Sequence, residues 1–186
     1  MKTFIYLFIS LFMSTVACKP ADVEAHSTQE TTSIDKPSMD IHAAILSNNI
    51  EVVKQHIETG SDLNVKEPMS GSTPLISAST FNRIEIAEAL INAGVDLNIK
   101  NKDGSTALHT AAFFCRIEIL QLLIDVHADK TIKNNFGATP RETVMGDFVQ
   151  VKPIYEMMIM QLKPLGFELD LKAVEKARPV VKLMLQ

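Results

Sequence analysis

The stretch STPLISASTFNRIEIAEALINAGVDLNIKNKDG, residues 72–104, decides the fold because the chain repeats its pattern at once. Residues 105–137, STALHTAAFFCRIEILQLLIDVHADKTIKNNFG, have the same length and the same landmarks in the same order. Each stretch opens with Ser-Thr, carries an Ile-Glu pair near its middle and ends on Gly. A phased period of 33 residues indicates stacked copies of one small structural unit.

The period extends in both directions from these two copies. Upstream, residues 39–71 carry the Ile-Glu pair at Ile50 and end on Gly, and a longer loop, VKEPMSG, absorbs one additional residue. Downstream, the chain keeps the opening TPRE and then departs from the pattern. The sequence therefore predicts a repetitive region over 39–170, divided into four units: 39–71, 72–104, 105–137 and 138–170.

Each unit is predicted to contain two helices. Thr73 and Thr106 are placed to cap a first, short helix through their hydroxyl groups, and Pro74 suits the first helical position because it lacks an N–H. Apolar residues then recur at helical spacing in a second helix, as in Ile84 to Ile91. Such a unit leaves an apolar face open on each side, so neighbouring units must stack to bury it.

The period, the openings TPLI, TALH and TPRE and the ending INAGVDLNIKNKDG resemble the ankyrin repeat from residue 39 to about 170. The resemblance implies an all-α solenoid of about four helix-turn-helix units with β-turn fingers. Residues 171–186 predict a C-terminal capping element, interrupted at Pro179, that resembles the C-terminal extension of small bacterial ankyrin proteins. In the fourth unit, we expect the second helix to start near Pro153.

His109 and Cys115 are the residues most suggestive of catalysis, as a thiol and an imidazole on one unit. Cys115 aligns with Asn82 and Asn48 at the turn between two helices, where Asn and Gly best tolerate a left-handed backbone. In the ankyrin repeats that this chain resembles, the histidine at the position of His109 forms hydrogen bonds with the backbone of the neighbouring loop and with the Thr hydroxyl group. We therefore predict no catalytic residue, and an enzyme that uses Cys115 and His109 is the less favoured alternative.

The N-terminus has the layout of a secretory signal peptide over residues 1–17: Lys2, an apolar run from Phe4 to Met13, and small residues up to Ala17. Ala17-Cys18 resembles the lipobox of bacterial lipoproteins, which implies acylation of Cys18. Thr15 departs from the large aliphatic residue usual there, which leaves cleavage by an ordinary signal peptidase as the alternative. Residues 18–38 then form the anchor cysteine and a disordered tether, poor in apolar residues.

These segments predict a protein of the bacterial cell envelope, a membrane lipoprotein facing the periplasm or the cell surface, with a soluble periplasmic protein as the alternative. The membrane is contacted only through the lipid. A net charge of −4, without a basic stripe, excludes nucleic acid as an expected partner. The five histidines are dispersed and no CxxC pair occurs, so we expect no metal and no cofactor. We also expect a monomer.

What remains is a protein-binding surface on the loops between units. Lys66, Lys100 and Lys133 recur in register and are expected to form a row along one edge. Further candidate residues on these loops are Lys102, Asp103, Asn134, Asn135 and Phe136. Phe136 either packs on the next unit or is an exposed anchor. The predicted function is a scaffold for a protein partner, and the alternative is a structural or stress-protective envelope protein without a specific partner.

Overall fold

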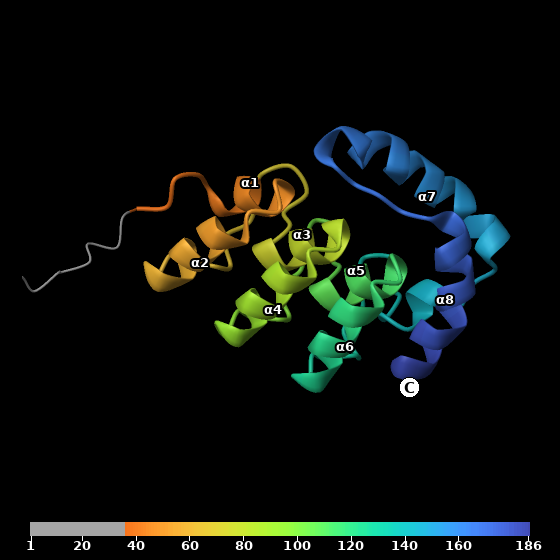
Figure 1. Cartoon of the computed structure of the whole chain (residues 1–186). Coiled ribbons are helices and arrows are strands. Elements are labelled where there is room, and N and C mark those ends of the chain that lie inside the picture. Colours follow the sequence, from red (N-terminus) through yellow and green to blue (C-terminus); the bar gives the residue numbers. More distant parts are fainter. Residues whose placement is uncertain (1–35) are drawn as a thin grey trace, which may run out of the picture. The chain divides into compact units, whose positions relative to one another are not determined.

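The computed structural model describes residues 36–186. The predicted signal peptide, Cys18 and nearly all of the tether lie outside this range. Within it the chain is all-helical and has no β-strand. The helices, labelled in Figure 1, are α1 (Ile41–Leu46), α2 (Ile50–Glu58), α3 (Pro74–Phe81), α4 (Ile84–Asn92), α5 (Ala107–Phe113), α6 (Ile117–Asp125), α7 (Phe148–Leu162) and α8 (Leu171–Met184), with 3-10 turns η1 (Glu142–Val144) and η2 (Lys163–Leu165).

The first six helices form three antiparallel pairs that stack side by side (Figure 1). The first helices α1, α3 and α5 contact one another in turn, and so do the second helices α2, α4 and α6. One continuous core runs between the pairs and contains buried residues from each, for example Ile45, Leu90 and Leu123. The predicted helical solenoid is therefore confirmed.

The predicted start signals and left-handed turns are also present. The Thr73 hydroxyl accepts a hydrogen bond from the Ile76 N–H at 3.3 Å, and Pro74 is the first helical residue of α3. The turns after the first helices have positive φ at Asn48, Asn82 and Cys115, with values of 54°, 55° and 52°. Cys115 thus takes the backbone conformation that its alignment with two asparagines predicts.

The fourth unit differs from the sequence prediction in two ways. Its second helix was expected to start near Pro153, which is wrong: α7 starts at Phe148, where the Asp147 carboxylate caps it, and Pro153 lies inside the helix. The predicted interruption at Pro179 is also wrong, because α8 is continuous through it. Pro179 lies on the exposed side of α8, while the buried residues of that helix hold the opposite face against the core.

The helix that continues the stack is α8 rather than α7. It contacts α6 and η1, just as α6 contacts α4 and α5, and its Val181 and Leu185 belong to the core of the repeats. Helix α7 instead contacts η2 and α8. Its buried residue Tyr155 belongs to a second cluster with Phe114 and Phe167. Helix α7 is therefore an insertion between a short first helix and the last helix of the stack.

Candidate binding surface

The loops between units are fingers held by side-chain amides. The Asn101 Oδ1 atom accepts hydrogen bonds from the N–H groups of Asp103 and Ser105 at 3.0 and 2.9 Å. Asn134, one period later, does the same with residues 136 and 138, both at 3.0 Å. Because each amide closes its own turn, the two fingers have the same conformation and few backbone groups left to reorganise.

The first finger replaces this amide with the carboxylate of Glu67. It accepts the N–H of Met69 at 2.7 Å, and both the N–H and the hydroxyl of Ser70. Partial burial raises the pKa of Glu67, but these hydrogen bonds and one from the Ser72 N–H outweigh it and bring the pKa to about 2. The first finger therefore carries a permanent negative charge that the other two lack at this position.

Backbone hydrogen bonds join the fingers to one another. The Lys102 N–H donates to the Ser70 carbonyl at 2.8 Å, and the Asn135 N–H donates to the Asp103 carbonyl at 2.9 Å. The Asn135 side-chain amide also donates to the Lys102 carbonyl at 2.8 Å. The three fingers are thus one connected surface rather than three independent loops.

The three lysines at the base of the fingers lie in register. The Lys66 ammonium donates to the Lys100 carbonyl at 2.8 Å, and the Lys100 ammonium donates to the Lys133 carbonyl at 2.9 Å. Each of these two side chains therefore reaches along the stack to the next unit. Lys102 points the other way and donates to the carbonyls of Pro68 and Met69, both at 2.7 Å.

Two apolar side chains project from the finger tips. Phe136 is 79% exposed, so it does not pack on the next unit, and the exposed alternative is the one observed. Met69 is 87% exposed at the tip of the first finger. Sequence reasoning missed Met69, although its place two residues before the finger glycine Gly71 could have indicated it.

Two arginines that the sequence interpretation did not use bind carbonyl groups near the C-terminal ends of α1 and α3. Arg83 donates to the carbonyls of Ile45 and Leu46, at 3.3 and 3.0 Å, at the C-terminal end of α1. Arg116, 33 residues later, donates to the Thr80 carbonyl at 3.2 Å. The signal was present, since Arg directly precedes the Ile-Glu pair in both central units.

His109 and Cys115 have separate structural roles. The His109 Nδ1 atom accepts the Thr106 N–H at 3.2 Å and lies 2.9 Å from the Thr106 hydroxyl, so Nε2 carries the proton and donates to the Ala138 carbonyl at 3.1 Å. The bonds predicted for His109 are therefore confirmed. The Cys115 thiol lies 3.8 Å from the Val174 carbonyl, and burial raises its pKa to about 11 despite two nearby arginines. A protonated, part-buried thiol is a poor nucleophile.

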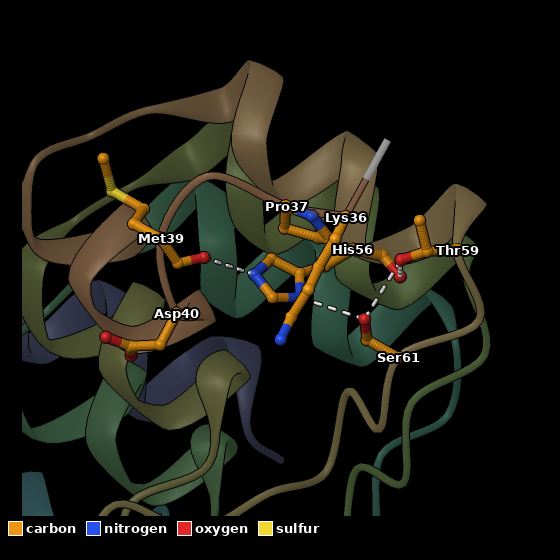
Figure 2. Close-up of a pocket in the computed structure, with 7 residues that line it drawn as sticks. All are labelled: Lys36, Pro37, Met39, Asp40, His56, Thr59 and Ser61. Atoms are coloured by element: carbon orange, nitrogen blue, oxygen red, sulfur yellow. Dashed lines mark hydrogen bonds between the residues drawn. The ribbon is translucent and has the colours of Figure 1, made fainter. Parts of the chain in front are cut away.

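A hollow lies at the N-terminal edge of the stack, where residues 36–40 cross α2 (Figure 2). It holds about 630 Å³ and opens widely to solvent. The His56 ring lies beneath it, with Nε2 2.9 Å from the Met39 carbonyl and Nδ1 3.1 Å from the Ser61 hydroxyl. Because both ring nitrogens have protein partners, His56 fastens the entering chain to the first unit.

Residues 36–186 contain no group of three or more His, Cys, Asp or Glu residues arranged to hold a metal ion. In the same range, every helix is too short or too polar to cross a lipid bilayer.

Stacked two-helix units with connected fingers define the chain as a helical repeat scaffold. Residues 41–134, half of the chain, match the family model described as ankyrin repeats (3 copies), so the chain belongs to the ankyrin repeat family. These repeats generally mediate protein–protein interaction. Among solved structures, the chain is similar to the ankyrin repeat domain of Bcl-3, a member of the IκB protein family.

The similarity to the Bcl-3 domain has 29% sequence identity and a TM-score of 0.54. It covers 55% of this chain and 45% of that chain, so this chain spans less than half the length of the protein it matches. The search of curated proteins found no match.

Proposed function

We propose that this chain is an ankyrin-repeat binding module of the bacterial envelope, exported by residues 1–17 and anchored through a lipid on Cys18. Its partner is a protein that docks on the finger surface. The observation that carries this proposal is the combination of connected, hydrogen-bonded fingers with exposed apolar tips at Met69 and Phe136. Rigid loops lose little entropy on binding, and an exposed aromatic side chain is a frequent source of interface energy.

The charges beside these tips favour an acidic partner surface. Lys66 and Lys100 are exposed and fixed by hydrogen bonds to the next unit, so their charges form a row along the base of the fingers with Lys133. At physiological salt such charges act over about 8 Å. They therefore steer association more than they strengthen the final complex.

The apolar tip is tested by Phe136→Ala in the full-length chain, with Leu183→Ala as the matched control. Leu183 is another exposed apolar residue, on α8 rather than on a finger. Proteins that co-purify after crosslinking in intact cells are quantified by mass spectrometry. We expect Phe136→Ala to deplete a specific partner severalfold and Leu183→Ala to retain it. Recovery of only abundant neighbours, unchanged by either variant, favours the structural alternative.

The lysine row is tested by changing Lys66, Lys100 and Lys133 together. The triple change to Glu is expected to slow association with the captured partner, while the triple change to Gln, which removes charge without reversing it, has a smaller effect. Single changes are poor tests because an exposed pair contributes only about 0.2–1 kcal/mol. An association rate that is the same for the Glu and Gln triples would contradict an acidic partner.

Anchoring is tested independently by Cys18→Ser and cell fractionation. We expect wild type in the membrane fraction and the variant in the soluble periplasmic or secreted fraction. A wild-type chain that is already soluble would exclude lipid anchoring and leave the finger surface unaffected.

A further inference from the structure

Helix α7 carries an apolar stripe that nothing in the described chain covers. Val149, Pro153, Met157 and Met160 are spaced by three or four residues, so they lie on one face of the helix. All four are exposed, and Val149 and Met160 at the two ends are 71% and 72% exposed. The opposite face contains Tyr155, which is fully buried in the aromatic cluster.

Helix α7 is not the next layer of the stack, because α8 takes that place against α6. Figure 1 shows α7 outside the row of paired helices, with α8 beside α6. A 15-residue helix is about 22 Å long. An insertion of that length with an apolar outer face indicates a second contact surface, separate from the fingers.

The charges on α7 indicate what covers the stripe. Its only two charged residues are Lys152 and Glu156, which lie 3.6 Å apart as an i, i+4 pair on one flank of the stripe. A balanced pair gives no net attraction to an anionic lipid surface, and the stripe lacks the aromatic side chains typical of interfacial helices. A partner helix that carries the same Lys–Glu pair in the opposite direction places a negative charge opposite Lys152 and a positive charge opposite Glu156.

We propose that the stripe pairs with the same stripe of a second copy of this chain, antiparallel and around a two-fold axis. In an antiparallel helix pair, equal flanks meet. The register that places Val149 opposite Met160 of the second copy brings Lys152 to within about one residue, or about 1.5 Å, of the level of Glu156 of that copy. Both copies then contribute the same surface, and two ion pairs form across the axis.

This proposal replaces the monomer expected from the sequence. A single helix face is smaller than the roughly 800 Å² per partner of a standard interface. The dimer therefore forms and dissociates with concentration and leaves the finger surfaces of both copies available. It does not depend on the lipid anchor or on the identity of the finger partner.

The antiparallel register is tested by crosslinking two differently tagged full-length copies, one with Val149→Cys and one with Met160→Cys, with a short bismaleimide. Gln55→Cys on exposed α2 is the control, and Cys18 and Cys115 are present in every copy as background. We expect the mixed pair to crosslink well above the control and above each variant paired with itself. Crosslinking of like pairs alone would overturn the antiparallel arrangement, and no crosslinking above the control would overturn the dimer.

The ion pairs are tested by sedimentation of purified full-length Lys152→Glu and Glu156→Lys variants, with circular dichroism to confirm folding. Each variant alone places like charges across the axis. We expect its self-association to be about two- to thirtyfold weaker than wild type, from two exposed pairs. An equimolar mixture restores opposite charges and is expected to regain wild-type association. Wild-type self-association in both single variants, or a mixture as weak as its components, would overturn this pairing.

Discussion

The central units, residues 72–137, and the C-terminal segment, residues 138–186, bury their surfaces by different means. In the central units the same hydrogen bonds to backbone carbonyls recur every 33 residues, as in those from Arg83 and Arg116 to carbonyls of the preceding unit. In the C-terminal segment the contacts are made by individual side chains. Periodic backbone contacts leave exposed positions free to vary, whereas the C-terminal segment depends on particular residues.

Tyr155 shows the difference most clearly. Its hydroxyl donates to the Phe113 carbonyl at 2.6 Å and accepts from the Arg178 guanidinium at 3.1 Å, while its ring stacks on Phe113 at 4.5 Å between centroids. Arg178 is buried and also donates to the Gly146 carbonyl at 2.8 Å. Burial raises the pKa of Tyr155 to about 12, although Arg178 lowers it. One side chain thus joins α5, α7 and α8.

The largest expected effect comes from removing that side chain. Tyr155→Ala is expected to destabilise the chain by about 3–5 kcal/mol, because a large buried ring leaves a cavity. Tyr155→Phe keeps the ring but leaves the Phe113 carbonyl and Arg178 short of a partner, at a cost of about 1–3 kcal/mol. Denaturant unfolding measures both. Equal losses for the two variants would mean that the hydroxyl, and not packing, holds α7.

A second pair of variants tests whether the fingers depend on backbone contacts. Gly104 has φ +73°, and a Cβ atom there would lie 2.7 Å from the Asn135 nitrogen, so Gly104→Ala is expected to cost about 2–3 kcal/mol. Gly137 has φ +76° but open space around it, so Gly137→Ala is expected to cost about 1 kcal/mol. Thermal unfolding compares them, and equal shifts would contradict a close contact between fingers.

The His109 bridge between units predicts a pH dependence. Burial, and secondarily the charge of Lys100, lower its pKa below the ordinary 6.5, against the raising influence of the Ala138 carbonyl. Stability from His109 is therefore complete above pH 6.5 and is lost as the pH falls through the lower folded-state pKa. The slope is at most about 1.4 kcal/mol per pH unit. His109→Ile, which copies Ile76 of the preceding unit, should remove this pH dependence from the free energy of unfolding. An unchanged slope of that free energy against pH would mean that other groups cause it.

The smallest effect concerns Cys115, where the two regions meet. Its thiol packs against both clusters, so Cys115→Gly gains backbone freedom but loses that packing, and we expect stability within about 0.5 kcal/mol of wild type. Cys115→Ala loses the packing without the backbone gain and is expected to be about 1 kcal/mol less stable than Cys115→Gly. Equal stability of these two variants in denaturant unfolding would show that the left-handed turn is unstrained.

The central units could be predicted from sequence because their signals are local and repeated. The Thr-Pro start of α3, the left-handed turns and the lysine register all follow from residue types at a fixed spacing. The position of α8 could not, since it depends on α7 folding out of the stack, and Pro153 suggested a helix start that Asp147 provides instead. The exposure of Phe136 depends on how the C-terminal segment after its loop folds, and no local sequence pattern specifies that.

Placing a photo-crosslinking amino acid at position 136 in the full-length chain, in intact cells, tests the finger surface most directly. Position 55 on α2 is the control, and both positions are exposed. We expect position 136 to capture a discrete protein that position 55 does not, with less capture when Lys66, Lys100 and Lys133 are changed to Glu. The same adducts from positions 136 and 55, or none from position 136, would contradict binding through the fingers.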